Sequence, residues 1–220
     1  VSTLNADWAD WQVTPAATKA PTQAEVGEAV ASLKRKKSKS PGLDGVTNWM
    51  LLWGGDKVVE VLHAMYALAW EEGVIPDQWC ESRIKFLYKG KDSRAEISNY
   101  RPISLMSVIG KTFTRAWLPR LVGILQQSFA WEQGCGREGQ GAMEQLWLFT
   151  DILEDCMDGK DGDSRKGACA LFADVHKAYD QVWRDGVYHG LYANGLRVNM
   201  WRMMQSWLDV TVDSPNWKWA

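Results

Sequence analysis

One apolar run that ends in a carboxylate constrains this sequence more than any other feature. Residues 168–173 read Ala-Cys-Ala-Leu-Phe-Ala, and Asp174 follows directly. An apolar run of this length, preceded by the polar residues 163–166, predicts a strand buried on both faces, with Cys169 packed as a small apolar residue. Such a strand fixes the position of the residue at its end, while the side chain of that residue stays accessible. Asp174 is therefore a candidate catalytic residue. The alternative is that its carboxylate caps the next helix.

The composition is that of a folded protein. The 220 residues are enough for one or two domains, with 46% hydrophobic and 24% charged residues. No apolar run approaches the roughly 20 residues of a membrane span, and no signal peptide is visible. The chain begins without a Met, which suggests a fragment or a processed product. Four widely spaced cysteines form no CxxC pair, which argues against a zinc site and favours a reducing, intracellular setting.

Charge is distributed unevenly along a nearly neutral chain. The formal net charge is −2, yet residues 82–120 hold nine Lys and Arg side chains against two acids. Residues 132–185 hold twelve acids against six bases. A basic segment beside an acidic one is what a polyanion groove next to a carboxylate metal site requires. The alternative, ordinary surface charge, is a poor explanation for the basic segment.

A second basic feature lies near the N-terminus. Residues 22–25 have the spacing of a capping box, and the helix that follows runs into five bases within six positions. This run is either a solvated helix end, where cations complement the helix dipole, or a contact surface for phosphates. Its members are Lys34, Arg35, Lys36, Lys37 and Lys39.

Periodicity predicts a mostly helical chain with one hairpin. Alternation of apolar and basic residues over 82–89, including Arg83, predicts a strand with a basic exposed face, and 100–105 is its returning partner. The predicted helix over 56–72 places its apolar stripe on Val58, Val61, Leu62, Met65, Leu68 and Ala69. Further helices are expected over 48–53, 107–127, 142–157, 184–194 and 198–208.

Four segments, in order, resemble the reverse transcriptases of non-LTR retrotransposons and their group II intron relatives. Residues 40–45 resemble the family's SPGxDG motif, and 99–105 followed by Lys111 resemble its N-Y-R-P-I-S-L…K motif. Residues 133–139 are similar to its Q-x-G-F-R-x-G stretch, although Cys-Gly replaces the usual aromatic position. Residues 172–182 resemble its F-x-D-x-x-K-A-F/Y-D-x-V motif. Because all four motifs occur in the family's order and at its usual spacing, their combination is specific for this family.

The resemblance implies an α+β fold, the fingers and an incomplete palm of a right-hand polymerase. Residues 1–21 are then a linker or irregular segment, 22–165 the fingers with connecting helices, and 166–220 a partial palm whose strand ends at Asp174. The implied reaction is nucleotidyl transfer from dNTPs to a DNA primer on an RNA template, inside the cytoplasm and nucleus of a host cell. No membrane and no protein partner is indicated.

The resemblance also implies roles for individual residues. Asp174 and the backbone carbonyl of Val175 are expected to be ligands in a site for two Mg²⁺ ions, which carboxylates and carbonyls suit. Arg101 is expected to hold the triphosphate of the nucleotide, with either Lys85 or Lys89 as a second cation. Tyr179 is expected to exclude a 2′-OH. Its alternative is a core aromatic.

One expected motif is missing. The family carries further carboxylates in an (F/Y)-x-D-D motif, and these 220 residues contain no Asp-Asp pair. The isolated chain is therefore expected to stop inside the palm, to be nearly inactive, and to expose the apolar flanks of its palm strand. A rival is a non-catalytic RNA-binding remnant of a degenerate retroelement. An RNA-dependent RNA polymerase is a second rival, which the bulky Tyr179 disfavours.

Overall fold

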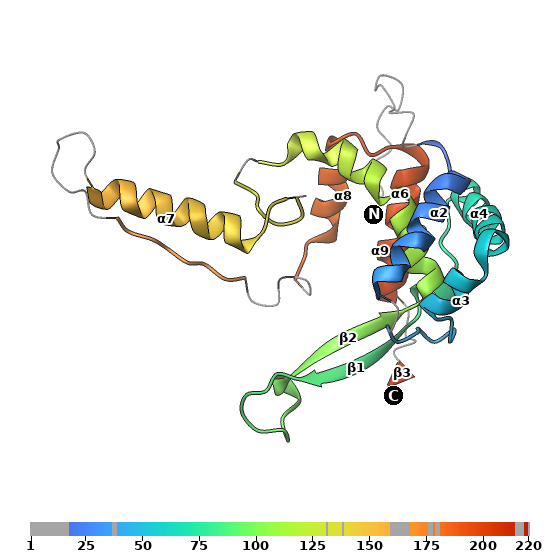
Figure 1. Ribbon diagram of the computed structural model, residues 1–220, viewed down its shortest axis with the longest axis horizontal. Helices are drawn as coiled ribbons and strands as arrows, with labels where there is room; N and C mark the ends of the chain where they lie inside the picture. Colours follow the sequence, from blue (N-terminus) through green and yellow to red (C-terminus); the bar gives the residue numbers. More distant parts are fainter. Residues whose placement is uncertain are drawn as a thin grey trace. The chain divides into compact units, whose positions relative to one another are not determined.

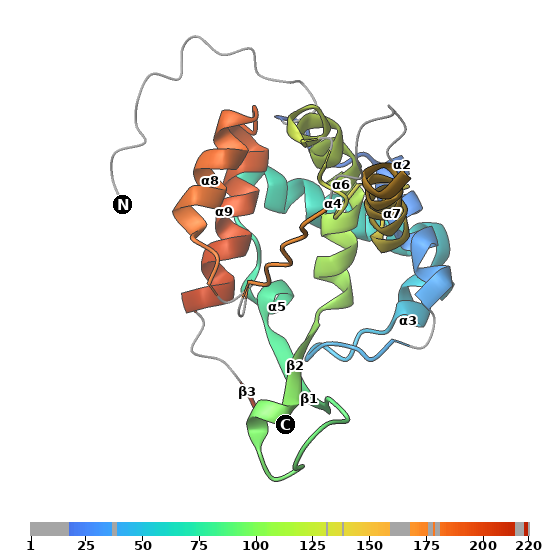
Figure 2. The same ribbon diagram turned by 90° about the vertical axis from the view of Figure 1, so that its left-hand side faces the viewer.

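The computed structural model describes residues 18–36, 39–130, 132–137, 139–158, 168–175, 178, 181–213 and 218–219. These residues form two compact units. One unit takes its residues from 1–124 and 188–220, and the other from 125–187. Figures 1 and 2 trace the elements of each.

The described chain is mostly helical with one antiparallel hairpin, which is compatible with an α+β fragment. The sequence-based helix and hairpin boundaries agree with the structure to within two residues, except that the helix predicted over 198–208 continues to Asp213. The elements are α2 (Gln23–Ala31), η1 (Ser32–Lys36), α3 (Asn48–Trp53), α4 (Gly55–Glu72), α5 (Asp77–Cys80), β1 (Ser82–Tyr88), η2 (Ile97–Asn99), β2 (Tyr100–Met106), α6 (Val108–Leu125), η3 (Gln126–Ser128), α7 (Ala142–Asp158), α8 (Arg184–Ala193), α9 (Val198–Asp213) and β3 (Lys218–Trp219).

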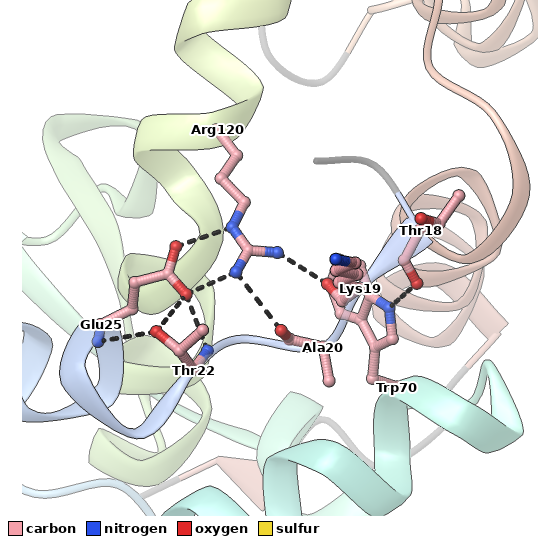
Figure 3. A network of polar contacts seen from close by, with 7 residues as sticks. All are labelled: Thr18, Lys19, Ala20, Thr22, Glu25, Trp70 and Arg120. Atoms are coloured by element: carbon pink, nitrogen blue, oxygen red, sulfur yellow. Dashed lines mark hydrogen bonds and ion pairs between the residues drawn. The ribbon is translucent and has the colours of Figure 1, made fainter. Parts of the chain in front are cut away.

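Helix α2 begins at the expected capping box. The Thr22 hydroxyl accepts a hydrogen bond from the Glu25 amide, and the Glu25 carboxylate accepts one from the Thr22 amide. The same carboxylate also pairs with Arg120 of α6 (Figure 3). Arg120 further donates to the carbonyl oxygens of Lys19 and Ala20. These contacts attach the segment before α2 to α6, which lies about 100 residues later in the chain.

An aromatic cluster between α4 and α6 forms the core of the first unit. The rings of Tyr66 and Trp70 on α4 pack against Phe113 on α6 at centroid distances of 5.0 and 6.4 Å. Trp117 and Trp79 join them, and all five side chains are at most 5% exposed. Burial of such large apolar surfaces is the main stabilising contribution in a domain of this size.

The apolar stripe expected on α4 is partly wrong. Leu62 and Ala69 are buried, but the rest of the buried face comes from the aromatic Tyr66 and Trp70. Val61 and Leu68 are 59% and 57% exposed. Helix α4 has two apolar faces. The face with the aromatic side chains is the buried one, because burying these larger side chains removes more apolar area from water.

The sheet has the strand order β2-β1-β3. β1 and β2 pair antiparallel from Ser82↔Met106 to Tyr88↔Tyr100, and β3 adds a short parallel pairing to β1. Pro102 lies in β2, an edge strand, where a residue without an N–H is tolerated. Figures 1 and 2 both show the β1–β2 ribbon projecting from the helices of its own unit.

The second unit contains α7 and the segment expected to be the palm strand. The prediction of a buried strand over 168–174 is wrong. The structure assigns no strand to these residues, and Leu171 and Phe172 are 93% and 82% exposed. Cys169, expected to be buried, is exposed as well. The physical reason is that none of the described strands pairs with this segment, and a strand needs a neighbour for its backbone hydrogen bonds. The Phe172 ring contacts Phe149 of α7, with centroids 5.6 Å apart.

Helices α8 and α9 pack against each other through aromatic rings. The Trp201 ring lies edge-on to those of Tyr188 and Tyr192, at 5.6 and 5.7 Å between centroids. α9 also supplies Met200 and Met203 to the core. Among the described residues, no helix has the length and apolar character needed to cross a membrane.

Candidate functional site

The β1–β2 hairpin has two different faces. Side chains alternate along a strand and directly paired residues share a face, so Arg83, Lys85 and Leu87 lie with their partners Leu105, Ile103 and Arg101. The opposite face carries Ile84, which is buried. Arg83, Lys85 and Arg101 are all exposed, so the prediction of a basic exposed face on β1 is confirmed. We call this surface, made of residues 83, 85, 87, 101, 103 and 105, the basic hairpin face.

Arg101 belongs to the N-Y-R-P-I-S-L…K motif, and Lys85 is one of the two lysines that the resemblance offers as a second cation. Lys85 is paired with Ile103 and Arg101 with Leu87, so the two side chains are diagonal neighbours, about 7–8 Å apart at the backbone. Among the described residues, neither side chain makes a hydrogen bond or an ion pair, so both charged groups are available for an anionic ligand.

Lys89, the other candidate second cation, is used by the loop that closes the hairpin. Its ammonium group donates to the Ser98 carbonyl oxygen at 2.6 Å. The hydroxyl groups of Tyr88 and Tyr100 bind the carbonyl oxygens of Asp92 and Arg94 in the same loop, at 2.5 and 2.9 Å. These contacts order the loop locally. The sequence left open whether Lys85 or Lys89 is the second cation. Of these two, Lys85 is the lysine whose ammonium group does not bind the loop.

Two motifs that are distant in sequence meet in space. The turn over residues 40–45 lies against the junction of β2 and α6, where a Cβ atom on Gly42 would approach the Ser107 nitrogen to 2.7 Å and the Met106 carbonyl carbon to 2.8 Å. Only glycine fits such a close backbone approach. The segment leading into α3 passes this junction in Figure 2. Sequence reasoning identified both motifs but not their contact.

The same contact brings a charged cluster together. Lys111 and Arg115 lie one turn apart on α6, and both are partly buried. The Asp44 carboxylate, which accepts a hydrogen bond from the Val46 amide at 3.1 Å, interacts electrostatically with Lys111. Burial and the neighbouring Arg115 charge lower the pKa of Lys111, while Asp44 opposes this effect. Sequence reasoning placed Asp44 and Lys111 in two separate motifs but gave Arg115 no role and did not bring the three together, although the helical spacing of the two bases was a usable signal.

The basic run after α2 is only partly described. Lys34 in η1 and Lys39 after it are exposed. The side chains of Arg35 and Lys36 and the whole of Lys37 lie outside what the structure describes. η1 begins at Ser32, whose hydroxyl group accepts a hydrogen bond from Arg115 at 3.5 Å. The basic run therefore starts next to the cationic pair of α6.

Asp174 and Val175 lie on the exposed extended segment of the second unit. Tyr179 lies outside the described residues, as do its neighbours Lys177 and Asp180. In the part of the chain that the structure describes, no group of three His, Cys, Asp or Glu side chains is arranged to hold a metal ion. Asp174 and the Val175 carbonyl stay predicted ligands, and by themselves they offer one carboxylate and one carbonyl, fewer donors than a two-metal site needs.

Comparison with known proteins finds homologues of this chain. No protein-family model matches the chain. The chain is 30% identical over 165 residues to the "Probable RNA-directed DNA polymerase from transposon BS" of Drosophila melanogaster. It is 27% identical over 170 residues to the "RNA-directed DNA polymerase from mobile element jockey" of the same organism. These alignments cover 74% and 76% of the chain.

This chain is a homologue of the non-LTR retrotransposon RNA-directed DNA polymerases. A third relative, the "Putative 115 kDa protein in type-1 retrotransposable element R1DM", is 32% identical over 124 residues. The chain spans less than a fifth of the length of each relative, with 17%, 18% and 12% covered. The homology is consistent with the motifs over residues 40–45, 99–111 and 172–182.

Proposed function

We propose that this chain is the fingers and part of the palm of an RNA-directed DNA polymerase, and that its basic hairpin face binds the triphosphate of a dNTP. The observation that carries the proposal is the placement of Lys85 and Arg101. Both lie exposed on one face as diagonal neighbours across the β1–β2 pair. The polymerase names of the homologues support the same substrate class.

The two side chains suit a triphosphate for different reasons. The Arg101 guanidinium is a planar fork that binds two phosphate oxygens at once, and it keeps its charge at any physiological pH. The Lys85 ammonium is a compact cation on a flexible stem. Two cations at diagonal positions of a hairpin reach neighbouring phosphates of one triphosphate. The ordered loop beyond them keeps the strands in register, so the spacing of the cations is maintained.

The remaining site residues belong to the proposed palm. In this proposal residues 22–165 are the fingers and 166–220 part of the palm, with Asp174 and the Val175 carbonyl as two ligands of a larger metal site. Mg²⁺, when bound there, would supply charge neutralisation for the reacting phosphate. Tyr179 would exclude a 2′-OH. Because one carboxylate cannot hold two metal ions, we expect the isolated chain to bind nucleotide without extending a primer on an RNA template.

Equilibrium binding of a dNTP to the 220-residue chain tests the proposal. Lys85→Gln and Arg101→Gln should each weaken binding about tenfold or more, because each removes a charge-assisted contact. Lys91→Gln is the matched control, since it removes one exposed positive charge from the hairpin loop. It should change binding less than about twofold, as long-range charge effects are screened by salt.

Three results would speak against the triphosphate site. Equal losses of dNTP affinity in all three variants would show a general charge effect. Unchanged binding in Arg101→Gln would show that Arg101 is not part of the site. A wild-type chain that binds RNA but no dNTP would favour the alternative of a non-catalytic RNA-binding module. Thermal denaturation of each variant checks that the fold is intact.

A further inference from the structure

Lys111 and Arg115 form a cationic pair on α6, and contacts within the described chain do not neutralise its charge. Among the described residues, neither Lys111 nor Arg115 forms an ion pair with a carboxylate. Arg115 donates a hydrogen bond to the Ser32 hydroxyl at 3.5 Å, a neutral partner. Both side chains are partly buried, where two like charges one helical turn apart repel each other with less screening than at the surface.

Asp44 relieves this repulsion only in part. The turn over residues 40–45 is placed by the close approach of Gly42 to the backbone of residues 106 and 107. This brings the Asp44 carboxylate into electrostatic range of Lys111, but one of its oxygens accepts the Val46 amide. Its attraction is smaller than the combined effects of burial and Arg115, since the pKa of Lys111 is lowered. Asp44 therefore compensates the Lys111 charge only in part, and the described contact of Arg115 is with the neutral Ser32 hydroxyl.

We propose that Lys111 and Arg115 form a binding site for a backbone phosphate of the RNA strand. This inference rests on the proposed function, because it assigns a template contact to a polymerase fragment. A phosphate diester would supply the negative charge that the pair lacks, and the guanidinium and ammonium groups both donate to its oxygens. The Ser32 hydroxyl gives Arg115 a neutral anchor that leaves its charge uncompensated.

A strand fits this location better than an isolated phosphate ion. η1, which starts at Ser32, continues into the basic run with the exposed Lys34 and, after it, Lys39. A polyanion gains from successive contacts along such a surface, because each neutralised phosphate releases counterions. The pair on α6 is then the partly buried end of a longer basic surface that includes the exposed Lys34 and Lys39.

Salt-dependent binding of a single-stranded RNA oligonucleotide tests this site. The logarithm of the binding constant falls linearly with the logarithm of salt concentration, by about 0.7 for each phosphate contact on a single strand. Lys111→Gln and Arg115→Gln should each reduce that slope by about 0.7 and weaken binding at low salt. Arg115→Lys keeps the positive charge and should therefore keep the slope. This variant distinguishes loss of charge from damage to the fold as the cause of a reduced slope. Lys57→Gln on α4 is the control, as it removes an exposed charge.

The readout is independent of nucleotide binding. Loss of slope in Lys111→Gln and Arg115→Gln with normal dNTP binding supports the site. An unchanged slope would overturn it even if Lys85 and Arg101 bind the triphosphate. Inorganic phosphate tests the other source of the same chemistry. Binding of inorganic phosphate that weakens in Lys111→Gln and Arg115→Gln, while the RNA slope of both variants stays unchanged, would show a site for free phosphate and would overturn the strand contact. Reduced slopes in a chain that binds no dNTP would leave this site standing and reject the triphosphate site.

Discussion

Glu25 and Arg120 form a two-point ion pair between the start of α2 and the middle of α6. The Arg120 Nε and Nη2 atoms lie 2.7 and 2.5 Å from the two Glu25 carboxylate oxygens, and the side chains are 14% and 28% exposed for Arg120 and Glu25. Figure 3 shows that Arg120 also reaches the backbone of residues 19 and 20. A single guanidinium therefore connects the capping box, the segment before it and α6.

Replacing Glu25 with Gln is expected to lower the free energy of unfolding by about 1–3 kcal/mol. The change keeps the shape of the side chain but removes a charged acceptor from a partly buried guanidinium, which then lacks a counter-charge. Urea denaturation followed by circular dichroism measures the effect.

The chain contains a matched control for this ion pair. Lys57 and Glu60 form an ion pair at 3.0 Å, but their side chains are 88% and 50% exposed. Exposed pairs contribute little, so Glu60→Gln should change the free energy of unfolding by less than about 0.5 kcal/mol. Equal effects of the two substitutions would contradict the assigned role of Arg120.

The contribution of Glu25 should depend on pH. Burial raises the pKa of this carboxyl, but the hydrogen bonds from Arg120 and Thr22 and the Arg120 charge outweigh burial and hold the pKa below the usual 4.5. A lowered pKa in the folded state stabilises the fold above the unfolded value, and this stabilisation is lost as pH falls through the folded value. The gap in unfolding free energy between wild type and Glu25→Gln should therefore be full near neutral pH. It should shrink as pH falls below about 4.5. A gap that stays constant down to acid unfolding would show that ionisation of Glu25 is not the cause.

Two glycines of α6 should respond oppositely to alanine. A Cβ on Gly110 would lie 2.9 Å from both the Cβ and the carbonyl oxygen of Trp79, whereas a Cβ on Gly123 meets nothing within 4 Å. Gly110→Ala should destabilise the fold by about 1–3 kcal/mol through overpacking. Gly123→Ala should stabilise it by up to about 1 kcal/mol through helix propensity. Thermal melts of the two variants provide the comparison, and a stabilising Gly110→Ala would exclude the close approach of α6 to Trp79.

The cysteines should differ in reactivity towards iodoacetamide. Burial, with a smaller effect of the Asp77 charge, raises the pKa of the Cys80 thiol to about 11. Cys135 and Cys169 are exposed. Because the thiolate is the reacting form, both should be alkylated at least about tenfold faster than Cys80 at mildly alkaline pH. Peptide mass spectrometry of timed samples resolves each site. Protection of Cys169 comparable to that of Cys80 would instead support the buried strand predicted from the sequence.

Much of the local structure was predictable because its signals lie within a few residues. The Thr22–Glu25 capping box marks the start of α2, and Gly73, with φ at 71°, ends α4 as a left-handed residue. The alternation of Ile84 with Arg83 and Lys85 predicted both the strand and its exposed basic face. The four motifs together indicated the resemblance to non-LTR retrotransposon polymerases before any comparison.

The rest depended on which partners the chain brings together. The apolar run ending at Asp174 has the composition of a buried strand, but a strand forms only where another backbone supplies its hydrogen bonds, and the described strands leave it unpaired. The sequence left open whether Lys85 or Lys89 is the second cation, and the Ser98 carbonyl engages Lys89. Sequence alone predicted the helices, the hairpin and the resemblance to non-LTR retrotransposon polymerases. Only the tertiary structure placed the turn at Gly42 against the start of α6 and brought Asp44 near Lys111, because long-range packing decides which charges meet.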